Sequence, residues 1–423
     1  MTFSNQDQAY VWSWLPGASE PVVAGLLSEQ GGEVSFIYGA SYLEREDAVP
    51  LYTPELPLGS TRIRPLPDLD APGCILDAGP DAWGQRVVIN RLTGTRRFDG
   101  NPAEFGTLTY LLESGSNRIG ALDFQSSPVN YQPRGIKNAT LEELVSSAER
   151  VEHGVPLTPE LDAALIAGSS IGGARPKALI DDGQKKLIAK FSSTTDNHPV
   201  VKGEFVAMRL ARLAGLDVAG VQLTEALDKT VLLIERFDRV PGSDERLAIV
   251  SALTMLELNE LAARWASYCD LAQIVRKRFT QPKSTLRELF SRITFNILVG
   301  NTDDHARNHA AFWDGRELFR PLTLTPAYDI CPQPRSTGEV RQAMIIGEDS
   351  DGFKDSRVAG CVDRSHLYQL TKPEAKEIVD RQIDVIETGW DEVCDEAELG
   401  EAERNAFHGK QFINPSALYG YQP

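Results

Sequence analysis

Positively charged residues are in short supply in this chain of 423 residues. Lys and Arg number 43 against 60 Asp and Glu, which gives a formal net charge of −17. Binding to nucleic acid relies on clustered Lys and Arg side chains that neutralise phosphates. The composition therefore disfavours autonomous binding to DNA or RNA, and any DNA contact would have to come indirectly, through a partner that brings the basic surface.

Cysteines and long apolar runs are also scarce. The five cysteines (Cys74, Cys269, Cys331, Cys361 and Cys394) are scattered and form no Cys-x-x-Cys pair, which argues against a zinc ribbon or a disulfide framework. No apolar stretch approaches the length of a membrane span. The first 17 residues are polar and then aromatic, unlike a secretory signal. We therefore expect a cytoplasmic protein with no membrane partner.

The chain does have the length and patterning of a multidomain α+β protein. Short apolar runs between Pro and Gly residues predict strands and turns near the N-terminus, and helical periodicity dominates the C-terminal part. We expect three domains: a β-rich N-terminal subdomain at 1–125, an α+β lobe at 140–245 and a mainly helical lobe at 246–423.

Local signals predict several elements within these domains. Residues 81–92 and 202–216 have helical patterns, and Thr140 with Glu143 forms a capping-box pattern ahead of another helix. An Asp-Asp-Gly turn predicts a hairpin between 176 and 191, and 221–237 predicts a second hairpin. Further helices are expected at 270–278, 284–299 and 371–394.

A glycine-rich stretch, GSSIGGARPK, occupies residues 168–177 directly before a predicted strand. Three glycines and two serines give a backbone that can surround an anion with its N–H groups. Its spacing is neither that of a Walker A loop nor that of G-x-G-x-x-G. The plain alternative is a flexible turn.

Lys190 lies in the strand that follows. Alternation places Leu187 and Ala189 on one face and Lys190 with Ile188 on the other. A partly buried lysine needs an anionic partner, which Glu204 in the next helix could supply. The alternative is a lysine on an edge strand at the surface.

The densest polar stretch is VGNTDDHARNHAAF, residues 299–312. Asp303 and Asn308 have the spacing of the catalytic loop in protein kinases, and Asp329 follows in LTPAYDI. Carboxylate and amide oxygens suit Mg²⁺. The glycine-rich turn, strand lysine, helix glutamate, Asp-x₄-Asn loop and final Asp follow the serial order of a kinase.

A rival interpretation treats Asp303, Asp304, His305 and His309 as a metal-dependent phosphohydrolase cluster. The remaining histidines (His153, His198, His366 and His408) sit in no convincing ligand pattern. A second rival is a pseudokinase that binds nucleotide without transferring phosphate. On the kinase interpretation, Asp304, Arg307 and His309 are supporting or solvated residues.

Four motifs resemble the HipA family of bacterial serine/threonine kinases, the toxins of type II toxin–antitoxin pairs. They are GSSIGGARPKA (168–178), LLIERFDR (232–239), GNTDDHARNHAAF (300–312) and LTPAYDI (324–330), and GPDAWGQRVV (79–88) resembles the leading domain of that family. The resemblance implies a protein-kinase-like α+β fold, with 140–245 as the ATP-binding lobe and 246–423 as the catalytic lobe, and an ATP- and Mg²⁺-dependent phosphotransferase.

The resemblance also implies roles for individual residues. Asp303 would orient and deprotonate the attacking hydroxyl, while Asn308 and Asp329 would hold Mg²⁺. The residues expected to contact ATP are Ser169, Ser170, Gly172, Gly173, Lys177, Lys190, Glu235, Phe237 and His305. Ser170 matches the serine that family members autophosphorylate. Added negative charge there would inactivate the enzyme, because the loop could no longer hold ATP phosphates.

Partners follow from the same resemblance. The substrate would be a protein, by analogy an aminoacyl-tRNA synthetase such as glutamyl-tRNA synthetase, and its phosphorylation would arrest growth. The expected binding partner is a small HipB-like helix-turn-helix antitoxin, which would supply the contacts with DNA.

Overall fold

The computed structural model describes residues 7–93, 105–135, 139–155, 165, 175–183, 185–193, 196, 198–334, 340–347 and 352–422. Contacts within the chain define two compact units. The first comprises Met1–Thr195, Thr224–Val250 and Phe312–Glu317, and the second comprises Asp196–Leu223, Ser251–Ala311 and Leu318–Pro423. The domain boundaries expected from the sequence stay a prediction.

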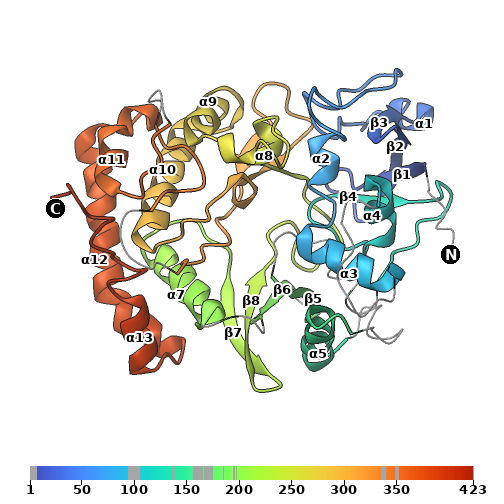
Figure 1. Ribbon diagram of the computed structural model, residues 1–423. Helices are drawn as coiled ribbons and strands as arrows, with labels where there is room; N and C mark the ends of the chain where they lie inside the picture. The colour runs from blue at the N-terminus through green and yellow to red at the C-terminus, as the bar shows by residue number, and fades with distance from the viewer. Residues whose placement is uncertain are drawn as a thin grey trace. The chain divides into compact units, whose positions relative to one another are not determined.

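The first unit begins with an antiparallel sheet of four strands in the order β3-β2-β1-β4 (Figure 1). Its strands are β1 (Gln8–Ser13), β2 (Val22–Gln30), β3 (Glu33–Tyr38) and β4 (Leu122–Gln125). Between β3 and β4 the chain forms helices α1 (Ala40–Leu43), α2 (Gly73–Leu76), α3 (Ala82–Thr93) and α4 (Thr107–Glu113). Helix α3 confirms the helix predicted at 81–92.

A second sheet in this unit has the order β5-β6-β8-β7. It comprises β5 (Lys177–Asp181), β6 (Lys186–Phe191), β7 (Val221–Ala226) and β8 (Lys229–Glu235), so both predicted hairpins are confirmed. Along β6, Leu187, Ala189 and Phe191 are buried and the alternate residues are only partly buried, as the alternation predicts.

Helix α5 (Leu141–Glu152) has the predicted capping box. The Glu143 N–H donates to Thr140 Oγ1 at 3.2 Å, and the Thr140 N–H donates to Glu143 Oε2 at 2.9 Å. Two N–H groups at the helix start are thereby satisfied, which fixes where the helix begins.

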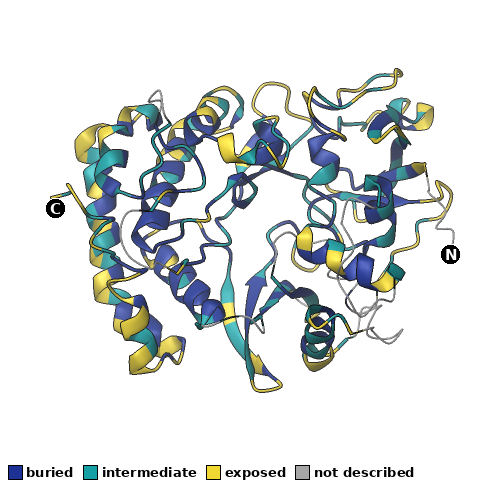
Figure 2. Cartoon of the chain, viewed as in Figure 1, coloured by how far each residue is buried: buried dark blue, intermediate teal, exposed yellow. Residues whose placement is uncertain are grey.

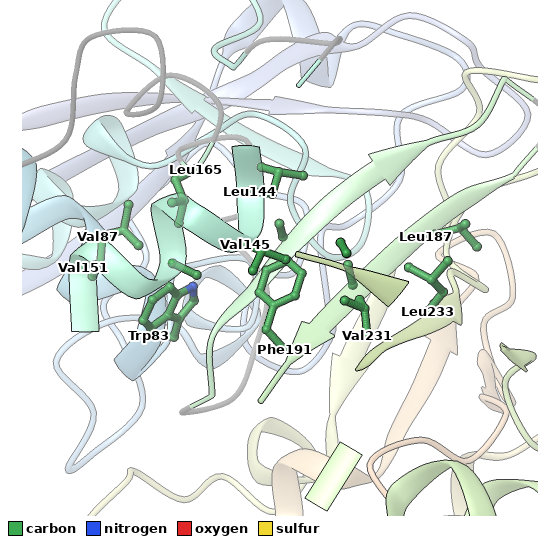
Figure 3. Packing of buried hydrophobic residues seen from close by; sticks show 14 residues of the cluster. Trp83, Val87, Leu144, Val145, Val151, Leu165, Leu187, Phe191, Val231 and Leu233 are labelled. Carbon is green, nitrogen blue, oxygen red and sulfur yellow. The ribbon is translucent and has the colours of Figure 1, made fainter. Parts of the chain in front are cut away.

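One hydrophobic cluster joins α3, α5 and the second sheet (Figure 3). Trp83 of α3 is completely buried in this cluster, close to Val145 of α5 and Phe191 of β6. The Trp83 indole N–H also donates to the backbone oxygen of Lys177 at 3.2 Å. The leading part of the chain therefore shares a core with the sheet that carries Lys177 and Lys190.

The second unit is mainly helical. It contains α7 (Val200–Leu213), α8 (Ala252–Met255), α9 (Tyr268–Arg278), α10 (Pro282–Leu298), α11 (Val358–Asp363), α12 (Lys372–Glu396) and α13 (Glu401–Phe407), with short 3₁₀ turns at Ala263–Trp265, Ala306–Asn308 and Ser365–Tyr368. The helices predicted at 202–216, 270–278, 284–299 and 371–394 are confirmed. Figure 2 shows that α10 is mostly buried, whereas α12 and α13 leave part of their surface exposed.

Three short strands, β9 (Ile249–Ser251), β10 (Ala310–Trp313) and β11 (Leu322–Leu324), form a third sheet in the order β11-β10-β9. Strand β10 begins directly after the polar stretch that contains Asp303 and Asn308. Among the helices that the structure describes, none has the length and apolar character needed to cross a bilayer.

Candidate active site

The polar loop begins where α10 ends. Beyond Leu298, the Gly300 N–H donates to Ile297 O at 3.2 Å and the Asn301 N–H donates to Asn296 O at 2.8 Å. This is the Schellman arrangement, in which the residue after the cap is left-handed. Gly300 has φ +72°, and a Cβ there would lie 2.7 Å from Gln411 O. The loop therefore leaves the helix at a point where only glycine fits.

Asn301 joins the loop to the segment that carries Asp329. Its Nδ2 donates to Asn296 Oδ1 at 3.0 Å and to the backbone oxygen of Asp329 at 3.3 Å. Asp329 has a left-handed backbone with φ +59°, which is uncommon for a residue with a side chain. The two parts of the predicted site are thus hydrogen-bonded to each other through a buried amide.

Asp303, His305, Asn308 and Asp329 come together in this unit. Asn308 is buried, and its Nδ2 donates to the backbone oxygen of Asp303 at 3.3 Å. The Asp303 side chain is exposed on one side. Even so, desolvation raises the pKa of its carboxyl group, His305 opposes that rise, and the nearby carboxylates of Asp329 and Asp304 add to it.

Asp304, the neighbour of Asp303, points into the interior. Its carboxylate accepts hydrogen bonds from the Tyr268 hydroxyl and from Asn296 Nδ2, the latter at 2.7 Å, and it pairs with His309 Nε2 at 3.0 Å. Burial would raise the pKa of Asp304, but His309 and the hydrogen bond from Tyr268 bring it below its usual value. Of the two alternatives for Asp304 and His309, supporting or solvated, the structure shows the supporting one.

Arg307 occupies the partly exposed side of the loop. Its guanidinium pairs with Glu260, with Nε donating to Oε1 at 2.5 Å. The backbone oxygen of Arg307 accepts a hydrogen bond from the Tyr328 hydroxyl at 2.6 Å. This second bond connects the 3₁₀ turn Ala306–Asn308 to the residue immediately before Asp329.

The donor set suits a hard divalent cation. Asp329 offers a carboxylate, and Asn308 offers an amide oxygen, because its nitrogen is directed to the backbone of Asp303. The carboxylates of Asp303 and Asp329 lie close enough for each charge to disfavour the other, which a cation between oxygen ligands would relieve. No group of three or more His, Cys, Asp and Glu side chains that could hold a metal occurs among the described residues.

The histidine-rich hydrolase interpretation is not supported by these contacts. His309 is buried, and its Nε2 is directed at Asp304 rather than at solvent. A transition-metal hydrolase needs several ligands that converge on one open position. His305 and His309 do not provide such a set with Asp303 and Asp304.

The residues expected to contact ATP phosphates lie partly in the second sheet. Strand β6 lies between β5 and β8, so the alternative of an edge-strand lysine at Lys190 is wrong. Lys177 and Lys190 are directly opposite in the β5–β6 register, which puts their side chains on the same face of the sheet. Lys177 is only 1% exposed, and its Nζ lies 3.6 Å from Asp81 Oδ2. Burial raises the pKa of Asp81, and Lys177 opposes the rise.

The expected adenine-contacting residues follow β8. Glu235 is partly exposed and pairs with Lys185. The ring of Phe237 meets that of Phe312 edge to face, with centroids 6.0 Å apart. Glu204, proposed as a partner of Lys190, is buried in α7. Ser169, Ser170, Gly172 and Gly173 lie outside the described residues.

Comparison with known proteins shows the family of this chain. The HipA-like C-terminal domain family matches residues 169–390, which is more than half of the chain. The chain belongs to the HipA family.

Relatives of this HipA-family chain extend the match. A Sinorhizobium fredii protein named as a kinase, Y4mE, is 25% identical over 366 residues, covering 79% of this chain and 82% of its own. The serine/threonine-protein kinase toxin HipA of Shewanella oneidensis is 25% identical over 209 residues, 43% of this chain and 47% of its own length. The prediction of a HipA-family kinase is confirmed.

A solved structure supports the fold over the whole chain. A chain of the Shewanella oneidensis toxin–antitoxin complex of HipA, HipB and operator DNA superimposes with a TM-score of 0.66 at 19% identity. The match covers 96% of this chain and 97% of that chain. The predicted α+β, kinase-like fold of HipA type is therefore confirmed, including its β-rich leading part.

Two residues that hold the loop of Asp303 and Asn308 were not expected from the sequence. Tyr268 and Asn296 contact Asp304 from two different helices, and neither belongs to a motif. The usable signal was the position of Asn296 between Phe295 and Ile297 near the end of α10, since an amide buried among apolar residues needs partners. Nothing in the sequence around Tyr268 distinguishes it from an ordinary core tyrosine.

Proposed function

We propose that this protein is an ATP- and Mg²⁺-dependent serine/threonine kinase that transfers the γ-phosphoryl group to a protein hydroxyl. The observation that carries the proposal is the compact group of Asp303, Asn308 and Asp329 around one rigid loop. Phosphoryl transfer requires positioning and neutralisation of charge more than covalent chemistry, and this group offers both.

In the proposed mechanism Asp303 accepts the proton of the attacking hydroxyl. Its side chain is accessible, while its neighbour Asp304 is fixed in the interior and holds the backbone still. Asn308 and Asp329 would hold Mg²⁺, which when bound neutralises charge on the phosphates. His305 lies near enough to Asp303 to stabilise its ionised form, and we assign it a contact with the nucleotide.

Nucleotide binding is assigned to the second sheet and the glycine-rich loop. Lys177 and Lys190 are directly opposite on neighbouring strands, so two positive charges lie on one face of the sheet. A polyphosphate group carries several negative charges that such a pair attracts, which supports assigning Lys177 and Lys190 to the ATP phosphates. Ser169, Ser170, Gly172 and Gly173 would surround the phosphates, with Glu235 and Phe237 at the adenine. Phosphorylation of Ser170 would switch the enzyme off.

The proposed partners rest on the relatives. A HipB-like helix-turn-helix antitoxin is the proposed binding partner, since the solved relative is in a complex with HipB and operator DNA. The net charge of −17 fits contact with DNA through such a partner only. The proposed substrate is an aminoacyl-tRNA synthetase, glutamyl-tRNA synthetase being the first to test, with growth arrest in the cytoplasm as the result.

Transfer of labelled phosphate tests this function. The purified chain is incubated with γ-labelled ATP and Mg²⁺, alone and with a cell lysate. We expect label on Ser170 and on one lysate protein, and loss of both in Asp303→Asn. Asp314→Asn is the matched control, because Asp314 is a partly exposed carboxylate that pairs with Arg316. Mass spectrometry assigns the label to Ser170 or to the adjacent Ser169.

The same assay separates the rival functions. ATP binding without any label would indicate a pseudokinase, and release of phosphate that needs Zn²⁺ or Mn²⁺ together with His305 would indicate a hydrolase. Phosphoproteomics after brief expression, wild type against Asp329→Ala, identifies the substrate. Identical phosphoproteomes in the two strains would contradict an enzymatic role.

A further inference from the structure

The segment after β8 has two faces with different surroundings. Glu235 and Phe237 are partly exposed, whereas Arg236, Asp238 and Arg239 are buried. In an extended segment, successive side chains point to opposite sides. The residues assigned to adenine therefore share a backbone with a buried group of three charges.

Asp238 is the centre of that buried group. Its Oδ1 accepts from Arg236 Nε at 2.8 Å, and its Oδ2 accepts from Arg236 and Arg239 nitrogens, each at 2.7 Å. The backbone N–H of Gly120 donates to the same Oδ2 at 2.8 Å. Burial would raise the pKa of Asp238, but Arg236 and Arg239 hold it far below its usual value, so the carboxylate is ionised.

Both arginines also bind a turn of the leading part of the chain, at residues 117–120. The backbone oxygen of Arg118 accepts from Arg236 at 2.7 Å and from Arg239 at 2.5 Å. Asn117 Oδ1 accepts from Arg236 at 3.0 Å and from Arg239 at 3.1 Å. The segment after β8 is thus held to this turn by charge-assisted hydrogen bonds, which are stronger than neutral ones.

The turn is itself anchored. The side chain of Arg118 is completely buried, and its guanidinium donates to Asp123 at 2.8 Å, to Ser114 Oγ at 2.9 Å and to the backbone oxygen of Ala78 at 3.1 Å. Ala78 directly precedes the Gly-Pro-Asp-Ala-Trp stretch that leads into α3. A continuous buried polar network therefore runs from the leading part of the chain to Glu235 and Phe237.

We propose that Arg236, Asp238 and Arg239, together with Asn117, are positioning residues for the nucleotide site: they fix the backbone that presents Glu235 and Phe237 to adenine. This inference rests on the proposed function, because it takes these two residues as the adenine contacts. It gives the N-terminal subdomain a direct part in nucleotide affinity, in addition to any part in binding partners.

Asn117→Ala is the variant that tests the network without altering the segment after β8. It removes one acceptor from both arginines but keeps every charge. Ser127→Ala is the control, because Ser127 is exposed and its Oγ accepts from the Val129 N–H at 3.3 Å instead. For Asn117→Ala we expect the KM for ATP and the Kd of a fluorescent ATP analogue to rise about five- to tenfold. The kcat should stay within about twofold of wild type, since the interaction is with bound nucleotide in both ground and transition states.

Asp238→Asn should give a larger rise in the same Kd. If that variant does not fold, Asn117→Ala remains sufficient. Discrimination between ATP and GTP should fall in Asn117→Ala and not in Ser127→Ala. A folded Asn117→Ala protein with wild-type Kd, KM and base preference overturns the inference.

Hydrogen exchange of the peptide covering 234–240 separates this inference from the proposed function. Faster exchange in Asn117→Ala than in wild type and Ser127→Ala supports the positioning role without requiring any activity. Unchanged exchange contradicts it. If the wild type binds no adenine nucleotide at all, the proposed function fails instead.

Discussion

The hydroxyl of Tyr268 donates a hydrogen bond to the carboxylate of Asp304, inside the unit that carries Asp303. Tyr268 is the first residue of α9, and Asp304 immediately follows the proposed base. Both side chains are almost completely buried, so the bond is shielded from water. The hydrogen bond between Tyr268 and Asp304 therefore fixes the backbone next to Asp303.

Tyr268→Phe should therefore impair catalysis more than binding. Loss of this bond to a charged acceptor should lower the free energy of unfolding by about 1.5–3 kcal/mol. We expect kcat to fall about tenfold with little change in the KM for ATP. Tyr368→Phe is the control, since Tyr368 is equally buried but its hydroxyl has no hydrogen-bond partner among the described residues. Equal kcat values for the two variants would contradict a positioning role for Tyr268.

Gly300→Ala should destabilise the protein through two separate effects. The residue must adopt φ +72°, and the added Cβ would meet the backbone of Gln411. Left-handed strain costs on the order of 1–2 kcal/mol, and the clash should bring the total to about 3 kcal/mol or more. Gly17→Ala isolates the strain, because Gly17 has φ +83° with nothing within 4 Å of the added Cβ. Urea unfolding measures the loss of stability in both variants. Similar losses of stability in Gly300→Ala and Gly17→Ala would show that the contact with Gln411 is unimportant.

Trp83→Ala should lower the stability of the first unit by about 3–5 kcal/mol, because it removes a fully buried aromatic side chain. It also leaves the backbone oxygen of Lys177 without the indole donor. Trp265→Ala should change the free energy of unfolding by only about 0.5 kcal/mol, since Trp265 is 63% exposed. Thermal unfolding checks both, and a mild effect of Trp83→Ala would mean that α3 does not share the core of the sheet.

The stabilising effect of Asp123 should depend on pH. Burial would raise the pKa of this carboxyl, but Arg118 and Arg134 hold it below its usual value. The stabilisation is then complete above the unfolded pKa of about 3.9 and is lost as pH falls toward the folded value. Asp123→Asn should cost about 3–5 kcal/mol at pH 7, because it leaves the completely buried Arg118 with an uncompensated charge.

The difference in the free energy of unfolding between wild type and Asp123→Asn should stay constant from pH 7 to about pH 5 and become smaller below about pH 4. Urea unfolding at pH 7, 5 and 3.5 follows it. Glu374→Gln is a control at an exposed carboxylate, where only a small difference is expected at any pH. If the difference in the free energy of unfolding between wild type and Asp123→Asn increases on acidification, the Asp123 carboxylate is not ionised in the folded protein.

Much of the fold could be predicted because its signals are local. The capping box of Thr140 and Glu143, the Asp-Asp-Gly turn and the alternation along β6 depend on neighbours a few residues apart. The spacing of Asp303 and Asn308 is also local, so the loop could be read directly from the chain. The edge-strand alternative for Lys190 could not be rejected in this way, because strand order depends on residues more than 40 positions away.

The sequence by itself determined the helix and strand pattern, the HipA-like motifs and the order of the candidate active-site residues. The tertiary structure alone decided which polar side chains face inward. Asp304 and Asp238 are both buried, and each is bound by neighbours in the sequence together with one donor from a distant segment, the Tyr268 hydroxyl for Asp304 and the Gly120 N–H for Asp238. A buried charge is stable only where several donors converge on it. The short stretches supply some of these donors, but only packing of the whole unit turns them inward and adds the distant ones.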